Sequence, residues 1–174
     1  VINKIDSADN EGINTVRENI RKVNPKATVI EAASPVTVEH PEMIRGKRVL
    51  VVEDGPTLTH GEMKYGAGDV AAEKLGAKEL VDPRPYTVKS ISATFEKYPN
   101  IGVLLPAMGY GAAQLKDLET TINNTKCDAV VIGTPIDLSR YIKIKKPSTR
   151  VKYDLQEIGA ITIETILREK KIIK

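Results

Sequence analysis

The stretch Arg48-Val49-Leu50-Val51-Val52-Glu53 decides the fold class of this chain. Four consecutive apolar residues between charged ones are typical of a strand that is buried on both faces of a parallel sheet, because a strand with one wet face alternates apolar and polar residues. Similar apolar runs occupy residues 101–105 and 129–132. We therefore expect an α/β protein built on a mainly parallel sheet.

Segments with apolar residues at helical spacing separate these strands. Helices are predicted over residues 11–23, 68–75, 90–98, 113–123 and 157–169, with Ser90 as an N-cap and Gly76 as a C-terminal stop. Further strands are predicted over residues 28–32, 79–82 and 150–155, the last as an edge strand that could run antiparallel. The alternation predicts flanking helices around the sheet, in a Rossmann-like, P-loop-related three-layer architecture.

Composition excludes several classes of protein. The 174 residues are 41% apolar, and no uncharged apolar run approaches the roughly 18 residues that span a bilayer. A net charge of +3 is too small to argue for nucleic acid, and the single Cys127 cannot form an internal disulfide. We expect a cytoplasmic protein that binds neither membrane nor nucleic acid. Abundant isoleucine, lysine and glutamate, without tryptophan, suggest a thermophilic source.

The segment Asn3-Lys4-Ile5-Asp6 has the N-K-x-D pattern of guanine recognition. The aspartate can accept two hydrogen bonds from the guanine edge, and the asparagine can serve the other edge of the purine. Ser34 ends the next strand and supplies a second candidate contact to the base. A purely structural alternative is that Asp6 caps the helix that follows.

The phosphate-binding loop G-x-x-x-x-G-K-[ST] does not occur in the sequence, and Val1-Ile2 resembles the end of a strand. We therefore expect an N-terminally truncated chain that hydrolyses no nucleotide alone and whose partner is the missing N-terminal half of its own protein. Residues 1–45 are predicted to be the distal end of a P-loop domain, and residues 46–174 a C-terminal α/β domain, with the connection at residues 34–46.

Functional groups gather in four loops that follow predicted strands, at residues 53–61, 82–86, 106–111 and 133–137. Ligands of open parallel sheets bind beyond the carboxyl ends of the strands. Asp54 and His60 are the candidate catalytic residues. His60 is the natural candidate for a general base, because imidazole ordinarily titrates near neutral pH. Candidate substrate and phosphate contacts are Thr57, Thr59, Arg84, Tyr110, Gln114 and Thr134. The last two loops are also explained as Gly- and Pro-rich turns.

Two weaker patterns carry no functional prediction. His40, His60 and Cys127 lack the spacing of zinc ligands, so no metal site is predicted. Residues 66–71 fit G-x-G-x-x-A, but the dinucleotide fingerprint follows a strand directly and this segment does not.

Longer strings of sequence carry a family resemblance. Residues 46–61, 81–86, 105–111 and 133–138 resemble cyclic 2,3-diphosphoglycerate synthetase and related predicted GTPases of archaea and bacteria. The resemblance implies the C-terminal part of a P-loop enzyme that uses GTP or ATP with Mg²⁺ on a small phosphorylated substrate. It also implies a ligand cleft that includes Asp54, Thr57, His60, Arg84 and Tyr110. Lys89 departs from the glycine expected in that family.

The leading hypothesis is a fragment of a nucleotide-dependent phosphotransfer or ligase-type enzyme that supplies base and substrate contacts. An alternative is a regulatory GTP-binding protein whose C-terminal domain docks a partner. A third hypothesis is an oligomerisation scaffold, in which a homo-oligomer forms and the loop residues are structural.

Overall fold

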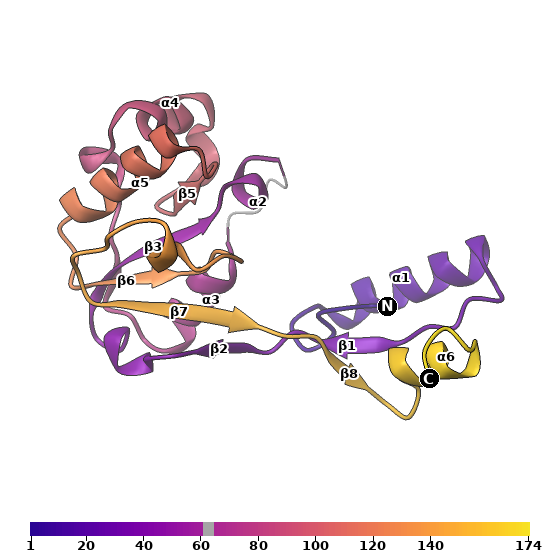
Figure 1. Cartoon of the computed structure of the whole chain (residues 1–174). Coiled ribbons are helices and arrows are strands. Elements are labelled where there is room, and N and C mark those ends of the chain that lie inside the picture. The colour runs from indigo at the N-terminus through magenta and orange to yellow at the C-terminus, as the bar shows by residue number, and fades with distance from the viewer. Residues whose placement is uncertain (61–64) are drawn as a thin grey trace. The chain divides into compact units, whose positions relative to one another are not determined.

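The computed structural model describes residues 1–60 and 65–174, which form two units (Figure 1). The sheet unit comprises Val36–Lys152, and the terminal unit comprises Val1–Pro35 together with Tyr153–Lys174. The division expected from the sequence, between a P-loop domain that ends at residue 45 and a C-terminal domain over residues 46–174, is not tested by these units and stays a prediction. None of the helices in the described part of the chain has the length and apolar character needed to span a bilayer.

The sheet unit is built around β3 (Arg48–Asp54), which pairs in parallel with three other strands. These are β4 (Glu79–Leu80), β5 (Leu105–Ala107) and β6 (Ala129–Ile132). Beyond β6 lie β7 (Ser148–Tyr153), also parallel, and the edge strand β2 (Val36–Val38). The apolar run of β3 is at most 1% exposed, which confirms the α/β class predicted from it.

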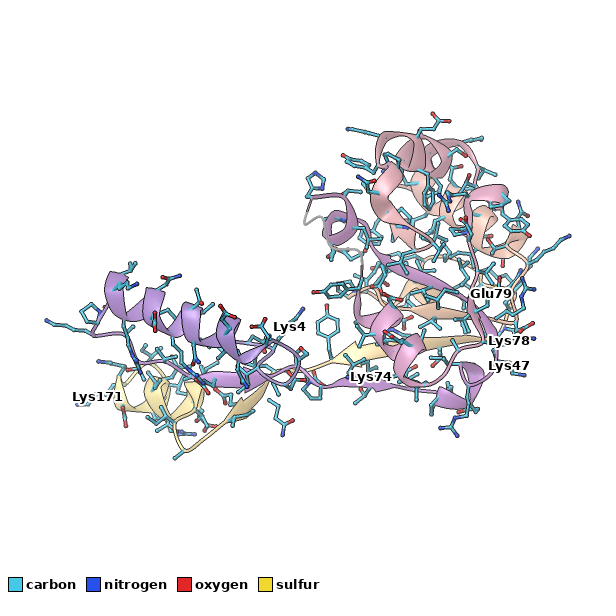
Figure 2. All side chains as sticks on the ribbon, turned by 180° about the vertical axis from the view of Figure 1, so that it is seen from behind. Lys4, Lys47, Lys74, Lys78, Glu79 and Lys171 are labelled. Carbon is cyan, nitrogen blue, oxygen red and sulfur yellow. The ribbon has the colours of Figure 1, made fainter. Side chains whose placement is uncertain are left out.

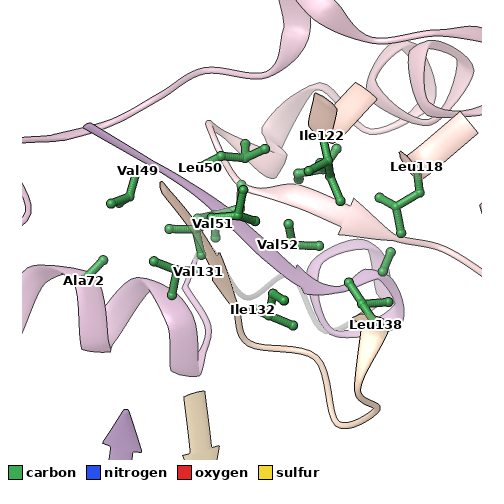
Figure 3. Packing of buried hydrophobic residues seen from close by; sticks show 14 of the residues in the cluster. Val49, Leu50, Val51, Val52, Ala72, Leu118, Ile122, Val131, Ile132 and Leu138 are labelled. Atoms are coloured by element: carbon green, nitrogen blue, oxygen red, sulfur yellow. The ribbon is translucent and has the colours of Figure 1, made fainter. Parts of the chain in front are cut away.

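Helices cover both faces of this sheet (Figure 1). They are α2 (Gly55–His60), α3 (Ala67–Lys74), α4 (Lys89–Lys97) and α5 (Ala112–Asn124). Leu118 and Ile122, four residues apart on α5, pack on one side of β3, and Ala72 of α3 packs on the other (Figure 3). The predicted three-layer architecture is therefore present.

The terminal unit contains α1 (Asn10–Val23), β1 (Glu31–Ala33), β8 (Gln156–Ile158) and α6 (Ile163–Glu169). β1 and β8 pair antiparallel, and Ile2 forms a parallel bridge with Glu31. Asp9 caps α1 by accepting a hydrogen bond from the Gly12 N–H at 2.7 Å. The structural alternative that Asp6 caps this helix is wrong.

Short 3₁₀ turns complete the connections of the sheet unit. They are Pro41–Met43, Arg84–Tyr86, Pro99–Ile101 and Leu138–Arg140. The strand predicted over residues 101–105 is displaced by the third of these turns, because Gly102 has a φ of 76° and ends it. β5 therefore begins only at Leu105.

Two predictions near the chain ends are wrong. The strand predicted over residues 150–155 as an edge strand that could run antiparallel is β7, which runs parallel to β6 and lies inside the sheet, because β2 forms the edge. The helix predicted over residues 157–169 begins only at Ile163, because residues 156–158 pair with β1 as β8. Gly159 then turns the chain with a φ of 106°.

Two local predictions in the sheet unit also fail. The N-cap of α4 is Val88, and Ser90 instead lies inside the helix, where its hydroxyl donates to Asp117 Oδ2 of α5 at 2.6 Å. The loop predicted over residues 53–61 is the helix α2 from Gly55 to His60, and residues 61–64 lie outside the described residues.

Candidate functional site

The carboxyl ends of β3, β5 and β6 meet at one edge of the sheet, which we call the carboxyl edge. Their parallel pairing sets Asp54 opposite Ala107 and Val52 opposite Ile132. The segments that leave this edge therefore start side by side. Lys47 and Lys78 lie together at the opposite, amino end of β3 and β4, where the Lys78 N–H donates to the Lys47 carbonyl (Figure 2).

Glu53 is a buried carboxyl at the carboxyl edge, and it is only 3% exposed. Its Oε1 accepts the N–H groups of Gly68 at 2.7 Å and Asp69 at 3.1 Å, in the first turn of α3. Free N–H groups and the positive end of the helix dipole favour a carboxylate there. These hydrogen bonds tie the end of β3 to the first turn of α3.

Three glycines leave room for the Glu53 carboxyl group. A Cβ at Gly68 would lie 2.8 Å from Oε1, and a Cβ at Gly133 would lie 2.6 Å from Oε2. A Cβ at Gly66 would meet the carboxyl carbon directly. Because these glycines come from two separate segments, both segments contribute to a cradle around Glu53.

Burial is the main cause that raises the pKa of Glu53 to about 7, and the charges of Asp69 and Asp54 add to it. The hydrogen bonds from the Asp69 and Gly68 N–H groups act in the opposite direction but do not cancel the effect. A carboxyl with this pKa can accept or release a proton near neutral pH.

Asp54 follows Glu53 directly, so its side chain lies on the other face of β3. The Thr57 hydroxyl of α2 donates to Asp54 Oδ2 at 3.2 Å. Burial, the charge of Asp54 and the neighbouring Tyr141 together raise the pKa of Tyr110. The ring centroids of Tyr110 and Tyr141 are 6.4 Å apart. The fold thus brings Asp54, Thr57 and Tyr110 together, as the strand-end pattern predicts.

His60 and Thr59 lie at the far end of α2. Thr59 Oγ1 donates to the Gly55 carbonyl at 3.0 Å and is 2.7 Å from His60 Nδ1. The His60 ring centroid lies 6.4 Å from that of Tyr98. Among the described residues no hydrogen bond joins His60 to Asp54, so a joint catalytic role for the two stays a prediction.

Arg84 is held by a neighbouring carboxylate. Its Nε lies 2.9 Å from both oxygens of Asp82, and a terminal nitrogen lies 2.6 Å from Oδ2. This guanidinium holds the pKa of Asp82 below its ordinary value. No hydrogen bond or ion pair of the described segments joins Arg84 to Asp54, so a shared site for the two stays a prediction.

The other two candidates are also engaged locally. Gln114 lines a small cavity with Ser90, Met108 and Gly109. Thr134 is buried and donates to the Ile136 carbonyl at 2.8 Å. Across residues 1–60 and 65–174, no hydrogen bond connects either side chain with Asp54. Their role in binding a substrate stays a prediction.

The candidate base contacts of the terminal unit do come together. Because Ile2 and Glu31 bridge in parallel, the N-K-x-D segment and Ser34 leave the same edge. Asp6 Oδ1 accepts the Ser34 N–H at 3.0 Å, and Asn3 Oδ1 accepts the Lys4 N–H at 2.8 Å. The exposed Asp6 carboxylate keeps acceptor capacity for a ligand.

Sequence reasoning missed Glu53, its glycine cradle and Tyr141. Two features of the sequence could have indicated this site: a glutamate directly after the fully apolar run of residues 49–52, and the G-x-G of residues 66–68. As for metals, the part of the chain that the structure describes holds no group of three or more His, Cys, Asp or Glu side chains placed to bind one.

Comparison with known proteins gives one informative relative. The chain is 62% identical over 169 residues to a protein named arginine synthetase ArcE, from Thermococcus kodakarensis. The match covers 97% of this chain, which spans only 38% of the length of that relative. No family model and no solved structure matches the chain.

This similarity corrects the family suggested by the sequence strings. The resemblance to cyclic 2,3-diphosphoglycerate synthetase is wrong, since the relative at 62% identity is named for arginine synthesis. The name synthetase is compatible with a nucleotide-dependent ligase, the broader class expected from the sequence. By sequence, the chain is similar to part of an arginine synthetase.

Proposed function

We propose that this chain is part of a nucleotide-dependent, ligase-type synthetase that forms arginine. The observation that carries the proposal is the 62% identity to the protein named arginine synthetase. The buried Glu53 carboxyl, with its pKa raised to about 7, supports it as a candidate proton acceptor at the carboxyl edge. Ligation requires removal of a proton from the attacking group, and a carboxyl that titrates near neutral pH is suited to that step. The name of the relative supplies the product.

The terminal unit would contact the base of the nucleotide, GTP or ATP with Mg²⁺. Asp6, Asn3 and Ser34 lie at one edge, and their carboxylate, amide and backbone groups fit the hydrogen-bonding edge of guanine. Since the chain contains no G-x-x-x-x-G-K-[ST] loop, the phosphates and Mg²⁺ would be bound by another part of a longer protein.

Exposed apolar side chains on the terminal unit support such a missing part. Leu155, Ile158 and Ile161 are each about half exposed, and Val23 is 87% exposed. Ile158 and Ile161 line the same open pocket, and apolar side chains exposed together on a small unit support a contact with further protein. We propose that the N-terminal half of the same protein covers this surface, with a second copy of the chain as the competing occupant.

Reversal of the reaction tests the function without knowledge of the precursor. The longer protein is incubated with L-arginine, Mg²⁺ and either nucleoside diphosphate plus phosphate or monophosphate plus pyrophosphate. We expect arginine-dependent formation of a nucleoside triphosphate, trapped by a coupled kinase. Absence of triphosphate in every combination of adenine and guanine nucleotides would refute the synthetase.

The base-recognition proposal predicts an effect of Asp6→Asn on nucleotide choice. Loss of the charged acceptor should weaken binding of a fluorescent guanine nucleotide to the longer protein by about tenfold or more. Xanthine carries a carbonyl where guanine carries an amine, so the asparagine amide should restore binding of a xanthine nucleotide. Unchanged guanine affinity in this variant would show that Asp6 does not contact the base.

A further inference from the structure

Tyr110 and Tyr141 form an exposed aromatic pair beside Asp54. Tyr110 is 41% exposed and Tyr141 56% exposed, and their rings are inclined at 37° with centroids 6.4 Å apart. They come from different segments, since Tyr110 precedes α5 and Tyr141 ends the turn after β6. The fold thus holds two partly exposed aromatic rings next to each other, on segments that follow β5 and β6.

Asp54 supplies a negative charge near this pair. Burial is the main cause that raises the pKa of the Tyr110 phenol, and the negative charge of Asp54 adds to it. Arg140 and Arg150 both pair with Asp137, at 3.6 and 3.8 Å from its Oδ2. Arg84, the residue expected to bind phosphate, is occupied by Asp82.

We propose that Asp54, Tyr110 and Tyr141 bind the guanidinium group of arginine. A guanidinium stacks on a phenol ring within about 6 Å of its centroid, and a carboxylate accepts two parallel hydrogen bonds from its edge. The Thr57 hydroxyl, which donates to one Asp54 oxygen, holds the carboxylate in place for this contact. The choice of guanidinium among planar cations rests on the proposed synthetase function.

Binding of methylguanidinium and of L-arginine to the 174-residue chain tests the site. Titration followed by the NMR signals of the tyrosine rings should show saturable binding of both, with shifts confined to Tyr110 and Tyr141. Tyr141→Leu should weaken binding by about fivefold through the lost cation–π contact, and Asp54→Asn by about tenfold through the lost charge. Tyr153→Leu, at a tyrosine of the terminal unit whose 47% exposure lies between those of Tyr110 and Tyr141, should have no effect.

Three results would overturn the site: no saturable binding, equal weakening by Tyr153→Leu, or tighter binding of inorganic phosphate than of methylguanidinium. Because Tyr141 is exposed, Tyr141→Leu remains a usable variant if Asp54→Asn fails to fold. Arginine-dependent formation of nucleoside triphosphate by the longer protein, without guanidinium binding here, would refute this site and leave the proposed function standing. Guanidinium binding at this site without triphosphate formation by the longer protein would refute the proposed function and leave the guanidinium site standing.

Discussion

Replacing Glu53 with glutamine is expected to remove most of a pH dependence that the wild-type chain shows between pH 4.5 and about 7. The pKa of Glu53 rises from 4.5 in the unfolded chain to about 7 in the folded one. The folded state therefore binds more protons in this range, so the free energy of unfolding falls as the pH rises. A shift of this size corresponds to about 3 kcal/mol, fully present below pH 4.5 and lost above pH 7.

Chemical denaturation at several pH values between 4 and 8 measures this effect. The carboxyls of Asp82, Glu31 and Asp137 have lowered pKa values, so the stability that they contribute is lost only at more acid pH. Glu164→Gln, at an exposed position on α6, serves as the control and should keep the wild-type profile. Parallel profiles for the wild type and Glu53→Gln would contradict the raised pKa.

The same substitution should also impair catalysis by the longer protein. Glutamine can still accept the N–H groups of Gly68 and Asp69, but it cannot take up a proton. We expect the arginine-dependent rate to fall by about 100-fold or more, a typical loss for a general base. A rate within a factor of about two of the wild type would exclude this role for Glu53.

Gly133→Ala is expected to destabilise the sheet unit by displacing Glu53. The added Cβ would lie 2.6 Å from Glu53 Oε2, and overpacking of this kind typically costs about 1–3 kcal/mol. The clash should disappear in a Glu53→Ala background, so a double-mutant cycle should show strong coupling between the two sites. Gly111→Ala, whose Cβ meets only the flexible Gln114 side chain at 3.2 Å, is the matched control.

Purely additive effects of Gly133→Ala and Glu53→Ala on the free energy of unfolding would contradict the cradle. So would equal destabilisation by Gly133→Ala and Gly111→Ala, since a general loss of glycine flexibility would then explain both.

The centre of the sheet could be predicted from the sequence because β3 and β6 contain fully apolar runs. β8 could not, because residues 156–158 form a strand only by pairing with β1, more than a hundred residues away. Ile158 and Ile161 also satisfy a helical spacing, so local pattern favoured the wrong element. Ser90 was likewise mispredicted as an N-cap, because its hydroxyl donates to Asp117 of another helix, which local sequence does not reveal.

The candidate site shows the same division. Asp54, Thr57 and Tyr110 follow the ends of parallel strands, and topology alone brings such residues together. Arg84 could not be placed, because Asp82, two residues before it, binds the guanidinium in a local turn. The environment of Glu53 depends on glycines from two distant segments, and no single stretch of sequence contains that information.

A ¹³C NMR titration of the Glu53 side-chain carboxyl, assigned by comparison with Glu53→Gln, tests the central claim most directly. If Glu53 is the proton acceptor at the carboxyl edge, its carboxyl signal should titrate with a midpoint near pH 7, well above the ordinary pKa of 4.5. A midpoint at or below 4.5 would show a carboxylate that is permanently ionised at neutral pH. Glu53 would then only anchor the first turn of α3, and the proposed role in catalysis would fail.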